Sequence, residues 1–188
     1  MTEENTPYEM IWWQQLHLDH ATLKQKKLKP HPTSYKAQLK RCRTPDEVVA
    51  TEAFRTLWLR LPKDKTKYPH SAYAWAAIAG VMAHVKKDKK STEKIKCFAS
   101  SLGEHDGDKP IVSPLRFKQL SQSRSVEAFY SRMIRTVHLI KGETFVKSLM
   151  QDMNKWFDEF HFDQHKPVSE RLAVRWAMDY YDQFPLTK

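Results

Sequence analysis

The sequence is poor in glycine, in cysteine and in long apolar runs. It holds 4 glycines and 2 cysteines in 188 residues. So little glycine argues against a domain with many tight turns and against a glycine-rich loop that holds a nucleotide. The longest apolar run, residues 72–85, is too short to span a bilayer and is typical of a buried helix. Cys42 and Cys97 lie far apart without a CxxC motif, which predicts free thiols in a cytoplasmic protein.

Positive charge, by contrast, is abundant and clustered. The chain has 32 Lys and Arg against 22 Asp and Glu, a formal net charge of +10. Residues 21–43 carry eight basic side chains and no acidic one, and residues 63–96 carry nine lysines against three acids. A charge run is often only a solvated surface, but clusters this strong attract polyanions and favour contact with nucleic acid.

Capping residues and apolar periodicity predict an all-α fold, a bundle of about nine helices. The segment Thr44-Pro45-Asp46-Glu47 has the pattern of a helix start with a capping box. Gly103 and Gly142 are typical of helix C-terminal ends. The predicted helices cover residues 7–19, 33–42, 45–60, 70–86, 92–101, 114–121, 126–141, 145–160 and 168–183.

Two domain organisations are compatible with this pattern. The chain forms either one domain over residues 1–188 or two helical lobes, 1–102 and 111–188. The dividing linker would be the acidic, glycine-containing segment 103–112.

The predicted helix 126–141 has one apolar and one basic face. At about 100° per residue, one stripe collects Val126, Phe129, Met133, Val137 and Ile140. Arg124 and Arg135 fall on the opposite side, flanked by Arg132 and His138. Glu127 is the single acid of this segment, so little negative charge neutralises the basic face. Such a face favours contact with a polyanion.

Other cations fall on neighbouring predicted helices. Lys40 and Arg41 lie on the polar side of helix 33–42, and Arg116 lies near the start of a short helix, where phosphate is favoured. In the last helix, Arg175 and Asp179 lie four residues apart and are expected to neutralise each other.

Motifs for catalysis or cofactor binding are missing. The sequence matches none of GxxxxGK[ST], GxGxxG and GxSxG. Two groups have a spacing that a metal could use, namely His17, Asp19 and His20, and His161, Asp163 and His165. Because this spacing alone is weak evidence, we predict no catalytic residue, no metal and no cofactor. The pairs Trp12-Trp13 and Trp156-Phe157 are predicted to pack in the core rather than to stack on bases.

Several short motifs follow one another in a distinctive order over residues 35–183. They are Leu39-Lys40-Arg41-Cys42-Arg43-Thr44-Pro45-Asp46-Glu47-Val48, Ala53-Phe54, Ser101-Leu102-Gly103, Arg116-Phe117-Lys118-Gln119-Leu120, Arg124, Arg132, Lys155-Trp156, Arg175-Trp176 and Tyr180-Tyr181. Their order resembles that of the CasB family, the small subunit of the type I-E CRISPR Cascade surveillance complex. Three features depart from it: Lys26–Lys29 has no counterpart, the insert Gly103–Pro110 is acidic, and Met133 occupies a place where the family can carry Arg.

The resemblance implies an all-helical protein that is not an enzyme. Its partners would be other Cascade subunits, a second copy of itself packed head to tail, guide RNA and target DNA, with no membrane and no small-molecule substrate. Its role would be to bind the backbone phosphates of the displaced DNA strand. The residues expected in this basic groove are Lys40, Arg41, Arg116, Arg124, Arg132 and Arg135, the last added from the helical face alone.

Two other classes stay open at this point. A stand-alone helical DNA-binding regulator would bind a duplex sequence tightly by itself. An enzyme acting on nucleic acid would have His161, Asp163 and His165 as its best site.

Overall fold

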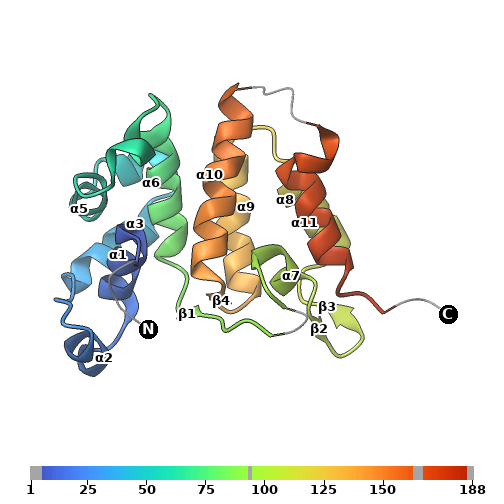
Figure 1. Ribbon diagram of the computed structural model, residues 1–188, viewed down its shortest axis with the longest axis horizontal. Helices are drawn as coiled ribbons and strands as arrows, with labels where there is room; N and C mark the ends of the chain where they lie inside the picture. Colours follow the sequence, from blue (N-terminus) through green and yellow to red (C-terminus); the bar gives the residue numbers. More distant parts are fainter. Residues whose placement is uncertain (1–5, 93–94, 163–166, 186–188) are drawn as a thin grey trace. The chain divides into compact units, whose positions relative to one another are not determined.

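Helices form almost all of the regular structure. The protein is described from a computed structural model over residues 6–92, 95–162 and 167–185 (Figure 1). It divides into two compact units, Met1–His84 and Val85–Lys188. The all-α prediction is confirmed, since strands within the described ranges are limited to four segments of two residues.

The first unit is built from six α-helices among its described residues. They are α1 (Tyr8–His17), α2 (His20–Gln25), α3 (Thr33–Arg41), α4 (Pro45–Val49), α5 (Glu52–Trp58) and α6 (Ser71–Met82), with a 3₁₀ turn at Lys63–Thr66. Helix α6 is buried on nearly every side and packs against α3, α4 and α5, as expected for the apolar run 72–85. The indole Nε1 of Trp75 donates to the Lys65 carbonyl oxygen at 3.1 Å, which holds the 3₁₀ turn on α6.

Two helix boundaries in this unit differ from the prediction. The predicted helix 45–60 is broken at Thr51, whose hydroxyl accepts from the Phe54 backbone N–H at 3.1 Å and starts α5. Helix α2 lies between the predicted helices 7–19 and 33–42, where no helix was predicted. Asp19 starts it by accepting from the backbone N–H of Thr22 at 2.9 Å. In both cases a side chain caps the N-terminus of a helix, and the apolar periodicity of the sequence did not show that this helix begins there.

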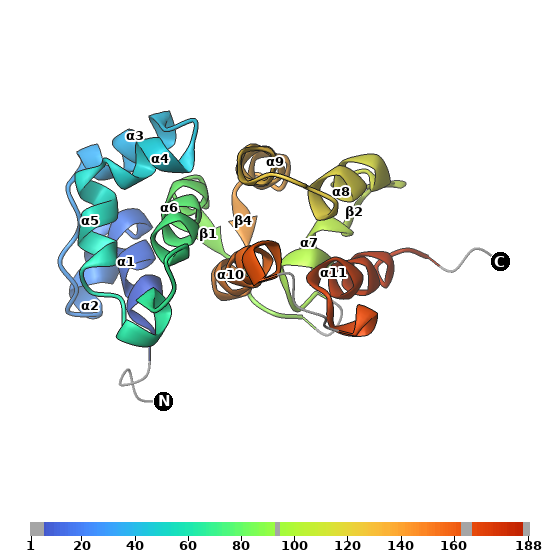
Figure 2. The same cartoon turned by 90° about the horizontal axis from the view of Figure 1, so that it is seen from above.

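The second unit has five α-helices in the part that is described. They are α7 (Phe98–Leu102), α8 (Pro114–Ser121), α9 (Val126–Leu139), α10 (Val146–Phe162) and α11 (Leu172–Tyr181), with a 3₁₀ turn at Val168–Glu170. Figure 2 shows α8 and α9 in one layer and α10 and α11 in a second, with α7 between them. Strand β1 (Lys87–Asp88) pairs in parallel with β4 (Glu143–Thr144), and β2 (His105–Asp106) pairs antiparallel with β3 (Lys109–Pro110).

Aromatic side chains fill the core of the second unit. The rings of Phe117 and Tyr180 stack at 4.0 Å, and those of Phe129 and Trp156 at 3.9 Å. Trp176 is buried and donates from Nε1 to a carboxylate oxygen of Asp152 at 2.9 Å. Trp12, Trp13, Trp156 and Phe157 are all buried, which confirms their predicted core positions.

The boundary between the units lies after His84, whereas the two-lobe alternative placed it in 103–112. That segment lies inside the second unit, where β2 and β3 form a hairpin around Gly107 with a φ of 66°. Of the predicted helix 92–101, residues 93–94 lie outside the described residues, and α7 begins only after Cys97. There the side chains of Cys97 and Ser100 each accept a hydrogen bond from the other's backbone N–H and so start the helix.

Two further sequence predictions concern the thiols and the apolar run. Neither Cys42 nor Cys97 is in a disulfide, as predicted. Within the described parts of the chain, every helix is too short or too polar to cross a membrane.

Candidate nucleic-acid interface

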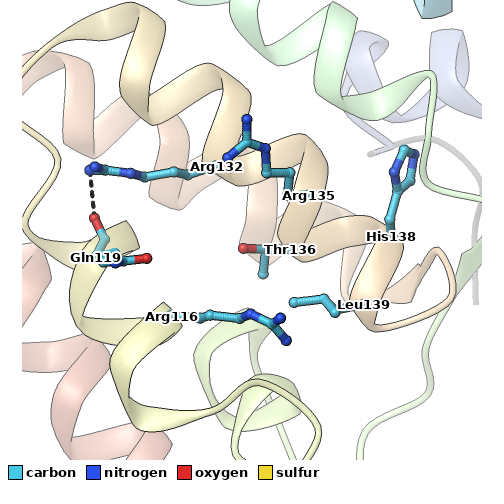
Figure 3. Close-up of a pocket in the computed structure, with 7 residues that line it drawn as sticks. All are labelled: Arg116, Gln119, Arg132, Arg135, Thr136, His138 and Leu139. Atoms are coloured by element: carbon cyan, nitrogen blue, oxygen red, sulfur yellow. Dashed lines mark hydrogen bonds between the residues drawn. The ribbon is translucent and has the colours of Figure 1, made fainter.

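A hollow with basic walls lies between α8 and α9. Its volume is about 550 Å³. The lining residues, drawn in Figure 3, are Arg116, Gln119, Arg132, Arg135, Thr136, His138 and Leu139. Both helices belong to the second unit, so the hollow is built within one compact part of the chain.

Helix α8 presents Arg116 through its local sequence. The helix starts at Pro114, where a missing N–H costs nothing, directly after the cap residue Ser113. Phe117 and Leu120 are buried and fix the opposite side of the helix against the core. Arg116 is therefore exposed in the first turn, and its side chain extends across the hollow toward Leu139 of α9 (Figure 3).

Helix α9 forms the other wall. Arg132, Arg135, Thr136 and Leu139 follow the spacing i, i+3, i+4, i+7, so they form one stripe along the helix. The buried stripe through Phe129, Met133 and Val137, predicted from the sequence, anchors the helix in the core. The predicted separation into an apolar and a basic face is therefore present in the structure.

Arg132 has a structural task as well as a charge. Its Nη1 donates to the Gln119 carbonyl oxygen at 2.7 Å and to the Ser123 hydroxyl at 3.0 Å. Gln119 lies in the last turn of α8, where carbonyl groups lack partners inside the helix. The guanidinium thus ties the end of α8 to α9 and is half-buried. Its remaining N–H groups, on Nε and Nη2, are the ones available for a ligand.

The positive charge of the hollow has no acidic partner in the described structure. There, no carboxylate lies within ion-pairing distance of Arg116, Arg132 or Arg135. Arg175 shows the contrasting case, since it pairs with the buried Asp152 of α10. This corrects the expected pairing of Arg175 with Asp179, whose carboxylate accepts from the Cys97 thiol at 3.3 Å.

Buried Asp152 belongs to the core and not to the interface. Burial raises the pKa of its carboxyl, and hydrogen bonding from Trp176 and the charge of Arg175 partly offset that effect. Its bonds to Arg175 and Trp176 join α10 to α11, so its charge serves the packing of the second unit.

The structure brings three of the six predicted contact residues into one site: Arg116, Arg132 and Arg135. Arg124 is exposed in the turn between α8 and α9 but does not line the hollow. Lys40 and Arg41 are exposed in the last turn of α3 and belong to the first unit. Gln119, Thr136 and Leu139 were not predicted from the sequence. For the latter two, the helical spacing from Arg132 was a signal that could have found them.

Two histidine groups had a spacing that a metal could use. Among the described residues, no group of three or more His, Cys, Asp and Glu side chains is arranged to hold a metal ion. Asp163 and His165 lie outside the described residues, so that prediction concerns a segment the structure does not describe.

The fold and the hollow define an all-α protein of two helical units, of which the second presents an arginine cluster without acidic partners among the described residues. The family model of the CRISPR-associated protein Cse2 matches residues 35–181. The chain therefore belongs to the Cse2 family, and the resemblance to the CasB small subunit of type I-E Cascade is confirmed. Neither the curated proteins nor the solved structures gave a match.

Proposed function

We propose that this Cascade subunit binds nucleic-acid backbone through the arginine hollow and stabilises the displaced strand of the R-loop, without catalysing a reaction. It would do so beside the guide RNA and the target DNA, together with the other subunits and a second copy of itself. We expect the protein to work in the cytoplasm.

The observation that carries this proposal is the convergence of Arg116, Arg132 and Arg135 on one hollow with no carboxylate partner among the described residues. A guanidinium is planar and offers several donors in a geometry that matches phosphate oxygens. A cluster of this kind contributes to affinity through charge and carries no information on base sequence.

The energetics of R-loop formation suit such a surface. The RNA–DNA hybrid that forms is about as stable as the DNA duplex that opens, so the exchange is nearly balanced. A few bonds to phosphates of the displaced strand are then enough to favour the open state. Three more exposed cations are proposed to contact backbone phosphates of the same displaced strand: Lys40, Arg41 and Arg124.

The test is charge reversal in the reconstituted complex. Arg116→Glu and Arg135→Glu should weaken target binding and reduce the slope of log affinity against log salt by about 0.7 for each single-strand phosphate that the variant no longer neutralises. The weakening should be similar for every target sequence paired with its own guide, because phosphates are the same in all of them.

Lys118→Glu is the matched control. Lys118 is exposed on the same helix as Arg116, two residues away, but does not line the hollow. The reversal changes the net charge equally, so it should change target binding much less. If Arg116→Glu and Arg135→Glu bind target DNA with the parental affinity and salt slope, or if Lys118→Glu weakens binding as much as they do, the proposal is wrong.

A further inference from the structure

A second cationic hollow lies in the first unit, in residues that precede the segment matched by the family model. It has a volume of about 510 Å³ and is formed around α2 and the loop that follows it. Lys24, Lys27 and Lys29 line it, together with the apolar side chains of Leu28 and Pro30.

The backbone fixes these lysines around the hollow. Helix α2 ends in a tight turn in which the Leu28 N–H donates to the Leu23 carbonyl oxygen at 2.9 Å. In this turn Lys27 adopts a φ of 54°, the left-handed conformation that favours glycine. The Nε2 of Gln15 then donates to the Lys29 carbonyl oxygen at 2.7 Å and holds the loop against α1.

Stability of the fold does not account for three lysines here. Within the described residues, no carboxylate lies within ion-pairing distance of Lys24, Lys27 or Lys29, and all three are exposed. Only Lys24 lies in the last helical turn, where a cation interacts favourably with the helix dipole. Lys27 occupies a backbone conformation that a lysine adopts at a cost.

We propose that this lysine hollow binds the phosphate backbone of a nucleic-acid duplex. Charge complementarity selects a polyanion, and a lysine ammonium contacts phosphate as a point charge. Among the described residues that line the hollow, the one aromatic ring is the imidazole of His20, and there is no Phe, Tyr or Trp; surfaces for single strands combine basic groups with large rings on which bases stack. The hollow therefore suits a duplex, whose bases stay paired. This site goes beyond the proposed function, because it lies in the other unit and takes a different form of nucleic acid.

The experiment compares two triple variants of the full-length chain on a random-sequence duplex at several salt concentrations. One variant carries Lys24→Gln, Lys27→Gly and Lys29→Gln. Glycine suits the left-handed position of residue 27, so this variant should fold. The control carries Arg55→Gln, Lys63→Gln and Lys67→Gln, which removes the same charge from exposed positions of the same unit.

The hollow variant should bind the duplex at least tenfold more weakly near 0.1 M salt, with a log–log salt slope reduced by roughly 0.9 for each duplex phosphate that is no longer neutralised. The control should stay close to the parent. Equal weakening in the two variants would show that only net charge matters and would overturn the proposal. An effect confined to single strands, or to poly-glutamate as an acidic-protein probe, would overturn it as well.

The same assay separates this site from the arginine hollow. If the lysine hollow acts independently, its substitutions should weaken duplex binding by the same factor in the parent and in the Arg116→Glu, Arg135→Glu background. If Arg116→Glu and Arg135→Glu had no effect on target binding in the assembled complex, the proposed function would be wrong, but the duplex binding measured for the lysine hollow would still stand.

Discussion

His17 makes the stability of the first unit dependent on pH. Its ring stacks on Trp13 at 5.3 Å, and both ring nitrogens are buried. Burial, followed by the charge of Lys36, lowers the pKa of His17 from 6.5 to about 3; the Met82 backbone opposes this shift, and the charges of Lys40 and His84 add to it. Replacement by phenylalanine removes the titrating group and keeps a ring beside Trp13.

The sign and size follow from proton linkage. The unfolded chain binds a proton at His17 below pH 6.5, whereas the folded chain does not until the pH nears 3. Stability is therefore complete above pH 6.5 and decreases as the pH falls through that window. A pH of 5 lies 1.5 units below the pKa of 6.5 that the imidazole has in the unfolded chain. At 1.36 kcal/mol per unit, the free energy of unfolding therefore decreases by about 2 kcal/mol. This value holds as long as the folded pKa stays below about 4.

The assay is urea unfolding at pH 5, 7.5 and 9. Between pH 7.5 and 5, the unfolding free energy of the parent should fall by about 2 kcal/mol more than that of His17→Phe. Between pH 7.5 and 9 the imidazole is neutral in both states, so the difference between the two proteins should stay constant. An equal decrease on acidification in parent and variant would refute the reasoning.

Two further predictions concern packing. A Cβ at Gly103 would lie 2.3 Å from the Tyr180 carbonyl oxygen, so Gly103→Ala should lower the unfolding free energy by about 2 to 4 kcal/mol. Gly107→Ala, which has open space and a φ of 66°, should cost only about 1 kcal/mol by the same denaturation assay. Arg132→Ala removes two hydrogen bonds and should destabilise by roughly 1 to 2 kcal/mol. Arg135 is exposed, so Arg135→Ala should change the stability measured by thermal unfolding by no more than about 0.5 kcal/mol. A larger loss of stability for Arg135→Ala than for Arg132→Ala would contradict the structural role of Arg132.

Long helices with a strong apolar stripe were predictable from the sequence. The interval 126–141 contains α9, and 145–160 overlaps nearly all of α10, because side chains at helical spacing must face one core. Helix α2 was missed because it has only one buried side chain, Leu23, and so shows no periodicity. Its existence depends on the cap formed by Asp19, a local hydrogen bond within a basic segment.

Gly103 shows how a correct position can have a different cause. It ends α7 as predicted, but its φ of −83° is open to any residue. Glycine is needed there because the backbone of α11 approaches closely at Tyr180. An approach between segments so far apart in the sequence leaves no local pattern. Helix α9 instead ends at Leu139, and the left-handed residue directly after its cap Ile140 is Lys141, with a φ of 57°; Gly142, with a φ of 79°, follows it and donates its N–H to the Val137 carbonyl oxygen at 2.8 Å.

The candidate site was predictable in charge but not in detail. The spacing of Arg132 and Arg135 on one helix gave the basic face of α9, and the acid-poor segment around them gave its sign. The sequence did not show that Arg132 bonds to the end of α8, since the partner is a backbone carbonyl, which every residue has. The position of Arg116 opposite α9 likewise depends on the packing of two helices.

Each of the two hollows is built wholly within one unit, so the two should bind phosphate independently. Arg116 and Arg135 lie on α8 and α9, whereas Lys24 lies on α2 and Lys29 on the following loop, which Gln15 of α1 holds by a hydrogen bond. The two hollows have no lining residue in common, and effects of substitutions without shared partners usually add. The geometry of each hollow therefore does not depend on how the units are arranged. Phosphate binding by one hollow should survive charge removal in the other, and the salt slope of the whole chain should be the sum of both.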